Sequence, residues 1–192
     1  MYKLYITLLL FCIQTISAQQ LRQPFDFPIL LSGNFGELRN NHFHSGIDFK
    51  TQGTEGKPVH AVQEGYVSRI SVSPWGYGNG LYLTHPDGTT TVYGHLQRFA
   101  PSIARYLKAQ QYEQESFNVN LFPTPDQLPV KKGEIVAYSG NTGSSGGPHL
   151  HFEVRDTESE EVLDPIEYFK EKITDTRAPK IQGILICPQQ GK

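Results

Sequence analysis

Short runs of apolar and polar residues, separated by turn-forming residues, dominate the pattern of this chain. Five of these runs are predicted to be strands, at residues 59–67, 80–85, 89–93, 134–138 and 149–154. The stretches between them include Pro86-Asp87-Gly88 and Lys131-Lys132-Gly133, whose residue types favour tight turns. No apolar pattern of helical period crosses the first hundred residues. The pattern therefore predicts a mainly β protein with an antiparallel β-sheet core.

Residues 100–129 break this pattern and predict one inserted helical segment. Residues 102–115 fit a helix with Ile103, Tyr106 and Leu107 on one face and Ser102 as its N-cap. The Pro-rich stretch at 122–126 then predicts a loop. The insertion could be a plain surface excursion, or it could form one wall of a substrate groove. We expect it to border the groove.

Both ends of the chain differ in character from the middle. Residues 1–18 resemble a secretory signal peptide, with Lys3, an apolar stretch and a small residue, Ala18, at the end. The apolar stretch is shorter than the ~20 residues that span a bilayer. Residues 171–192 are expected to be a linker and the start of a further, incomplete domain. Residues 19–170 would then form one domain without cysteine. Removal of the signal peptide would also remove Cys12 and leave Cys187 as the only thiol.

The charge of the chain argues against one class of binding partner, nucleic acid. The formal net charge is −2, and no basic stripe or arginine cluster is visible. We therefore expect no nucleic-acid partner. The short apolar stretch at the N-terminus predicts no membrane-spanning segment. The signal predicts export to a periplasm, cell envelope or extracellular space, and the sequence does not indicate an oligomeric state.

The chain carries histidines and one aspartate at spacings that suit a metal site. His149 and His151 are two apart, so on a strand they share one face. His44 and Asp48 are four apart, an even offset that puts both side chains on one side of an extended segment. Two imidazoles and one carboxylate can hold zinc and leave a fourth position open for water, as in catalytic zinc sites. His95 follows the predicted strand at 89–93. The other histidines, His42, His60 and His85, receive no role.

Several motifs occur in one order: His44-x-x-x-Asp48, then Tyr93-Gly94-His95-Leu96, residues 140–143 (GNTG) and residues 147–153 (GPHLHFE). From residue 31 to residue 169 the chain resembles the lysostaphin-type zinc metalloendopeptidases, which cleave peptide cross-links of bacterial peptidoglycan. The resemblance implies an antiparallel β-sheet core of the duplicated-hybrid-motif type. It also implies one Zn²⁺ per chain on His44, Asp48 and His151, with His95 and His149 as catalytic histidines. Gly146 departs from the pattern, since a threonine is common there.

The expected function is a secreted zinc-dependent endopeptidase that hydrolyses peptide bonds of peptidoglycan with metal-activated water. The alternative is a non-catalytic regulator or binding module of cell-wall hydrolases on the same fold. A phosphocarrier domain of related β-fold is a third candidate, although such a domain works in the cytoplasm and the predicted signal argues against it. The sequence does not assign separate roles to His95 and His149.

Three residues near these motifs have further expected roles. Glu153 lies two residues after His151 and would share its face of the strand. It could therefore hydrogen-bond to the ring of a ligand histidine on the side away from the metal. Trp75 and Tyr77 lie in a glycine-rich loop and could either pack against the fold or line the groove. We expect Trp75 to be a packing residue.

Overall fold

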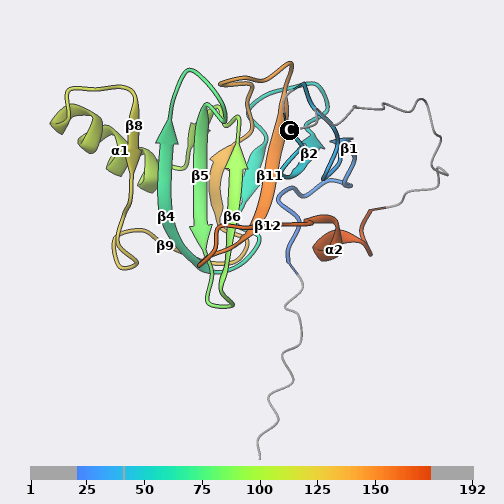
Figure 1. The fold of residues 1–192 in the computed structure, drawn as a ribbon. Helices are drawn as coiled ribbons and strands as arrows, with labels where there is room; N and C mark the ends of the chain where they lie inside the picture. Colours follow the sequence, from blue (N-terminus) through green and yellow to red (C-terminus); the bar gives the residue numbers. More distant parts are fainter. Residues whose placement is uncertain (1–20, 41, 174–192) are drawn as a thin grey trace, which may run out of the picture.

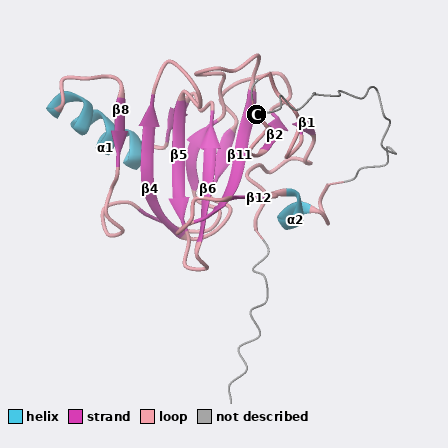
Figure 2. Ribbon diagram, in the orientation of Figure 1, coloured by secondary structure: helices cyan, strands magenta, loops and turns pink. Residues whose placement is uncertain are grey.

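The computed structural model describes residues 21–40 and 42–173 of the chain (Figure 1). The expected signal peptide, Cys187 and nearly all of the expected C-terminal segment lie outside these residues. Within them the protein is mainly antiparallel β-sheet, with two helices (Figure 2). This confirms the predicted fold class.

The larger sheet has nine strands, and its main path runs in the order β1-β2-β11-β6-β5-β4-β8. The strands on this path are β1 (Leu31–Gly33), β2 (Ile47–Lys50), β11 (His149–Asp156), β6 (Thr89–Gly94), β5 (Asn79–Thr84), β4 (Gly65–Val72) and β8 (Val119–Leu121). Two short strands join it at the side: β12 (Val162–Leu163) pairs with β11, and β9 (Pro129–Val130) pairs with β4. Figure 1 shows β4, β5, β6 and β11 side by side as the broad centre of the molecule. All pairings are antiparallel, and β11 lies between β2 and β6.

A second, three-stranded sheet has the order β3-β10-β7. Its strands are β3 (Pro58–His60), β10 (Ile135–Tyr138) and β7 (Arg98–Phe99). The sequence pattern had predicted one strand over residues 59–67, and this is wrong: the chain leaves β3 after His60 and enters the large sheet at β4. The reason is a corner at Ala61 and Val62. Both are fully buried, but their backbone groups bond to Gly133, Glu134, Arg22 and the Tyr93 hydroxyl instead of to a strand ladder. Apolar periodicity does not distinguish such a buried corner from a strand.

Alternation along β11 separates the core from the site. Leu150, Phe152 and Val154 are fully buried on one face, and His149, His151 and Glu153 occupy the other positions. The ring of Phe152 makes edge-on contacts with Phe49, Tyr93 and Phe169. This aromatic cluster holds β2, β6 and α2 (Ile166–Phe169) against the central strand. The register of β11 is therefore fixed by the core, because a one-residue slip would expose the apolar face.

The inserted segment contains helix α1 (Pro101–Glu113). Ile103 and Leu107 are buried and Tyr106 is partly buried, as predicted. The helix starts one residue earlier than expected, with Ala100 as N-cap and no side-chain cap, so the prediction of Ser102 as cap is wrong. Proline at the first helical position needs no hydrogen-bond acceptor for its nitrogen, and its fixed φ suits a helix start.

The expectation that residues 100–129 border a functional groove is also wrong. After α1 the chain forms β8, which pairs with β4 and buries Val119 and Leu121 in the core. Leu128 is buried next to it. Figure 1 shows α1 and β8 at the end of the sheet beyond β4, whereas β2 and β11 lie at the other end. The insertion extends the sheet and its core at the edge remote from β2.

No helix in the described part of the chain is long and apolar enough to cross a membrane.

Buried His85 predicts a pH dependence of stability. Its Nδ1 donates to the Glu64 carbonyl at 2.8 Å, its Nε2 lies 2.8 Å from the Thr91 hydroxyl, and burial lowers its pKa. The unfolded chain takes up this proton near pH ~6.5, whereas the folded chain takes it up only at lower pH. The His85 contribution to stability is therefore full above that pH and falls as the solution becomes more acidic. Urea unfolding of chelator-treated wild type and His85→Gln, from about pH 8 to about pH 5, should give a stability difference that shrinks with acid. A difference that stays constant over this range would contradict the assignment.

Candidate metal centre

Strand pairing brings two of the candidate ligands together. In the β2–β11 ladder His151 lies directly opposite Asp48, and in the β6–β11 ladder it lies opposite Gly94. Directly opposite residues of antiparallel strands have Cβ atoms ~5 Å apart. Register alone therefore places the His151 ring beside the Asp48 carboxylate, at the end of β6 that leads into His95.

His44 reaches the same point from a loop. Its backbone N–H donates to the Glu37 carbonyl at 2.8 Å, and its carbonyl accepts from Gly36 at 2.9 Å, so the chain folds back on itself before β2. The side chains of His44 and Asp48 do converge, as predicted, but a shared extended segment is not the cause. His44 precedes the strand, and the turn into β2 directs its ring towards Asp48.

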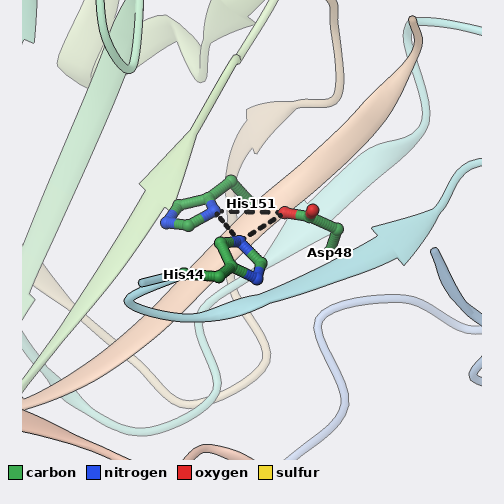
Figure 3. A group of neighbouring side chains, drawn as sticks. All are labelled: His44, Asp48 and His151. Atoms are coloured by element: carbon green, nitrogen blue, oxygen red, sulfur yellow. Dashed lines mark hydrogen bonds and ion pairs between the residues drawn. The ribbon is translucent and has the colours of Figure 1, made fainter. Parts of the chain in front are cut away.

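The three side chains form a tight triangle (Figure 3). His44 Nε2 lies 3.0 Å from His151 Nδ1 and 3.2 Å from Asp48 Oδ1, and His151 Nδ1 lies 3.1 Å from Asp48 Oδ1. Ligand atoms bound tetrahedrally to zinc at ~2.1 Å are ~3.4 Å from one another. The triangle is thus close to the size of a zinc ligand set. Among the described residues it is the only group of three such side chains with donor atoms this close.

The hydrogen bonds on the far side of each ring also favour a cation. His44 Nδ1 donates to the Asn34 carbonyl at 2.8 Å, and His151 Nε2 donates to a Glu153 carboxylate oxygen at 2.8 Å. In the neutral form that binds a metal, rings held in this way turn their unprotonated nitrogens towards Asp48. Three electron-rich atoms facing one another in a buried site need a shared positive charge. The residues fit a zinc ion, with an open position left for water or substrate.

The pKa of Asp48 reflects the same arrangement. Burial alone would raise it, but while no metal is bound, hydrogen bonds and positive charge from His151 and His44 in their protonated form hold it well below its usual range. The carboxylate is therefore ionised in the state that binds metal. Its second oxygen, Oδ2, accepts from Arg39 Nη2 at 3.1 Å, and the same nitrogen contacts Glu37 at 3.1 Å.

Arg39 is a site residue that the sequence motifs do not reveal. The only signal available is that a buried ligand carboxylate has a second oxygen that needs a donor. Gly33 of β1 leaves the room for this contact: a Cβ there would lie 2.3 Å from Asp48 Oδ2 and 2.5 Å from Arg39 Nη2.

His95 and His149 lie beside the triangle, with their ring centroids 4.7 Å apart. His95 Nδ1 donates to the Thr142 carbonyl at 2.8 Å, and His149 Nδ1 donates to the Gly147 carbonyl at 2.8 Å. Each neutral ring therefore has an unprotonated Nε2 available as an acceptor. Burial, together with repulsion from His149 and His151, lowers the pKa of His95 to about 4. His149 Nε2 lies 3.5 Å from Asp48 Oδ1, so the two extra histidines adjoin the ligand set without belonging to it.

Interlocked loops hold these histidines. His95 has a φ of 58° and donates its backbone N–H to the Tyr77 carbonyl at 2.8 Å. The Thr142 hydroxyl lies 2.9 Å from both the Asn79 N–H and the Leu96 carbonyl. The loop before β5 and the loop before β11 are thus bonded to each other on either side of His95. Backbone strain of this kind persists where the surroundings over-determine it, often at functional sites.

In the glycine-rich loop, Tyr77 and not Trp75 packs against the protein. Trp75 is 75% exposed, so the expectation that it packs in the interior is wrong. Tyr77 is the residue that turns inward: its ring stacks on His151, with centroids 5.2 Å apart and planes 24° apart. The glycine and serine residues in this part of the chain predict a loop. They do not predict which of its two aromatic side chains points into the protein.

A cavity of about 750 Å³ opens over the site. It lies between the loop before β2, the Gly76–Tyr77 loop and the loop before β11. Its lining includes the four candidate histidines and the aspartate: His44, Asp48, His95, His149 and His151. His42, to which the sequence assigns no role, also lines the cavity but is not part of the ligand triangle. His60 and His85 are buried elsewhere in the fold.

An antiparallel fold with a His-Asp-His triangle at the floor of an open cavity has the ligand composition of a catalytic metal site. A model of Peptidase family M23 matches residues 42–112 and 108–165, and the chain belongs to this family. The family agrees with the resemblance that the motifs predicted.

Curated relatives have similar sequences. The chain is 31% identical over 118 residues to DD-carboxypeptidase/endopeptidase Mpg of Neisseria meningitidis serogroup B. This match covers 62% of this chain and 21% of Mpg. It is also 31% identical over 139 residues to peptidoglycan DD-endopeptidase ShyC of Vibrio cholerae. That match covers 69% of this chain and 26% of ShyC. The chain thus spans about a fifth to a quarter of the length of these relatives.

Among solved structures, the catalytic domain of the antimicrobial peptidase lysostaphin from Staphylococcus simulans is similar. The TM-score is 0.54 at 28% identity, and the match covers 74% of this chain and 92% of that domain.

Proposed function

We propose that this protein is an exported, zinc-dependent endopeptidase that hydrolyses peptide bonds of bacterial peptidoglycan. The observation that carries the proposal is the combination of a complete ligand triangle with two further histidines that have open Nε2 atoms. A binding module or regulator would need neither, so this combination favours an enzyme over the non-catalytic alternative. Mpg is named a DD-carboxypeptidase/endopeptidase, ShyC a peptidoglycan DD-endopeptidase and lysostaphin an antimicrobial peptidase, which supports the substrate class. Because peptidoglycan lies outside the cytoplasm, this substrate class in turn supports export.

His44, Asp48 and His151 would hold the zinc ion. When bound, zinc supplies a Lewis acid that polarises the scissile carbonyl and lowers the pKa of water. The chain itself supplies proton transfer and hydrogen bonding. His95, whose pKa is low, is neutral near pH 7 and can accept a proton at Nε2. His149, next to it, can donate to a developing negative charge once its ring is protonated. This division between the two histidines is part of the proposal.

The shape of the cavity is consistent with a peptide substrate. Its walls are loops and it is open to solvent. Among the described residues that line it, Asp48 is the only acidic side chain. Gly76 and Gly146 line two of its sides, and glycines allow a substrate backbone to approach closely. Arg39 contributes positive charge at one wall.

Incubation of the full chain with purified peptidoglycan tests the function. One arm uses peptidoglycan with glycine bridges, and the other uses peptidoglycan with direct D-amino-acid cross-links. We expect the zinc-loaded protein to release new amino termini from at least one, detected by mass spectrometry of the soluble fragments. Chelator-treated protein should release none, and added zinc should restore release. Wall binding by zinc-loaded protein without any new amino terminus would overturn the enzyme and favour the binding module.

A further inference from the structure

Arg39 is the only lysine or arginine among the described residues that line the cavity, and its side chain is 38% exposed. Its guanidinium nitrogens differ in their contacts. Nη2 donates to Asp48 Oδ2 and contacts Glu37 Oε2, both at 3.1 Å. Nε is buried and Nη1 is accessible, and neither has a hydrogen-bond partner among the described residues. One nitrogen therefore holds the site together, and Nη1 remains a charged donor at the cavity wall.

The loop before β2 fixes Arg39 relative to the ligand triangle. The backbone N–H of Arg39 donates to the His42 carbonyl at 2.8 Å, and Leu38 pairs with Phe43 in an antiparallel bridge. The residue after Phe43 is the candidate ligand His44. Backbone hydrogen bonds of one loop thus set the spacing between the guanidinium and a metal ligand.

The charges around Arg39 favour a further anion. Asp48 faces His44 and His151 and, when zinc is bound, the ion, so its charge is already compensated. Glu37 contacts Arg39 but is not among the residues that line the cavity. An anionic group of a substrate would therefore meet a positive wall with a free N–H donor. In a peptide that group is a carboxylate, for which arginine is a strong partner.

The position of Arg39 limits which carboxylate it can reach. Arg39 donates directly to Asp48, so a group on Nη1 lies close to the bond that is cleaved at the metal centre. One peptide residue spans at most ~3.6 Å, so the carboxylate must belong to a residue next to that bond.

Peptidoglycan peptides offer such a carboxylate at two places. A diamino dicarboxylic acid that is cross-linked through one amino group keeps the carboxyl group on the same carbon. The last residue of an uncross-linked stem keeps its C-terminal carboxylate. In both cases the residue that contributes the amino group of the scissile bond has a free carboxylate on the same carbon. Residues within a glycine bridge have none.

We propose that Arg39 determines specificity: it binds the free carboxylate of the residue whose amino group is released, and so selects substrates that carry this group. The inference rests on the proposed function and adds to it the kind of bond that is cleaved. Arg39 touches the substrate away from the reacting atoms, so it governs the choice of substrate.

The test measures kcat/KM on two pairs of soluble probes. The first pair is a stem-peptide dimer cross-linked through a diamino dicarboxylic acid, with the carboxyl group beside the cross-link either free or amidated. The second pair is a single stem peptide that ends in D-alanyl-D-alanine, as the free acid or as the C-terminal amide. A preference in the first pair assigns the carboxylate to the cross-link, and a preference in the second assigns it to the chain end.

The zinc-loaded wild type should prefer the free acid of at least one pair by about 10- to 100-fold, the range for a hydrogen bond between charged groups. Arg39→Gln should reduce that ratio to near one. Arg105→Gln, a matched change at an exposed position of α1, should keep it. No preference in the wild type, or an unchanged ratio in Arg39→Gln, would overturn the proposal.

The ratio separates substrate binding from support of Asp48. If Arg39 only held Asp48 in place, Arg39→Gln would lower kcat/KM alike for the free acid and the amide. Arg39→Lys is the second variant if Arg39→Gln does not fold. It keeps the charge but has a single nitrogen, which cannot donate at the separate positions of Nη2 and Nη1, so the preference should fall. An undiminished preference in Arg39→Lys would overturn the assignment to Nη1.

Two further outcomes distinguish this inference from the proposed function. A wild type that hydrolyses peptidoglycan with glycine bridges and none of the probes would keep the proposed function and overturn the inference. A wild type that hydrolyses neither peptidoglycan nor probes would refute the proposed function, and calorimetric titration with the same probes would then decide the inference. Tighter binding of a free acid than of its amide, lost in Arg39→Gln, would support it, and equal binding would overturn it.

Discussion

Alanine at His151 is expected to abolish zinc binding, whereas alanine at His149 is expected to leave zinc bound and remove most of the activity. His151 supplies one corner of the ligand triangle, and without it only His44 and Asp48 remain. Zinc content should fall from near one per chain to near zero, and thermal stability should fall with it, because metal binding is coupled to folding. His149 is two residues away on the same strand, but its Nδ1 is committed to Gly147 and the triangle is complete without it. Its loss should lower kcat/KM by about 10²- to 10⁴-fold, the scale of a lost general acid–base group.

Atomic absorption and a peptidoglycan-hydrolysis assay on the same protein samples measure both effects. His42→Ala is the control, since His42 lines the cavity outside the triangle and should keep its zinc. If His149→Ala lost zinc while His151→Ala retained it, the ligand and the catalytic histidine would be exchanged. If His42→Ala lost zinc, the ligand set would be misassigned.

Alanine at Gly78 is expected to disable the site, whereas alanine at Gly76 should be mild. Both glycines have a left-handed backbone, with φ of 64° and 58°. They differ in their surroundings: a Cβ at Gly78 would lie 2.4 Å from the backbone carbon of Thr142, and a Cβ at Gly76 would have nothing within 4 Å. Gly76→Ala therefore costs only the local strain, about 1–2 kcal/mol. Gly78→Ala must also push apart the loops that hold His95, and a displacement of ~1 Å near reacting groups can lower activity by ~10²-fold.

Activity, zinc content and thermal unfolding of both variants test this expectation. The interlock predicts that Gly78→Ala loses activity well beyond its loss of stability and that Gly76→Ala does not. Equal effects of the two substitutions would mean that the contact between the loops does not position His95.

The strand-borne half of the site could be predicted from sequence because it follows a period of two. His149 and His151 lie on one strand, and Asp48 lies on a strand that leads into the core, as its apolar neighbours Ile47 and Phe49 indicate. Glu153 was expected behind His151 by the same periodicity, and it contacts Nε2 of that ring. The alternation of side chains along a strand depends only on local sequence, so it can be predicted without knowledge of the tertiary fold.

The parts that escaped prediction depend on tertiary contacts. The turn that brings His44 to Asp48 is set by bonds to Gly36 and Glu37, not by the four-residue spacing. Arg39 has no local pattern at all. The segment from 100 to 129 carries a helix and a Pro-rich loop typical of a surface insertion, yet β8 completes the large sheet. Which side of a sheet an insertion joins is decided by strand pairing over long distances, which composition does not reveal.

The pairing of β2 with β11 has a consequence for the order in which the protein matures. His151 Nδ1 meets Asp48 across 103 positions of the chain and His44 across 107. A growing or partly translocated chain that has not yet released β11 therefore offers a metal only two of its three ligands. Because contacts of such long range form late in folding, zinc capture should be among the last events of maturation. Under the proposed function, hydrolytic activity would then begin only after nearly the whole domain has formed, and a chain cut short before β11 would be unable to attack peptidoglycan.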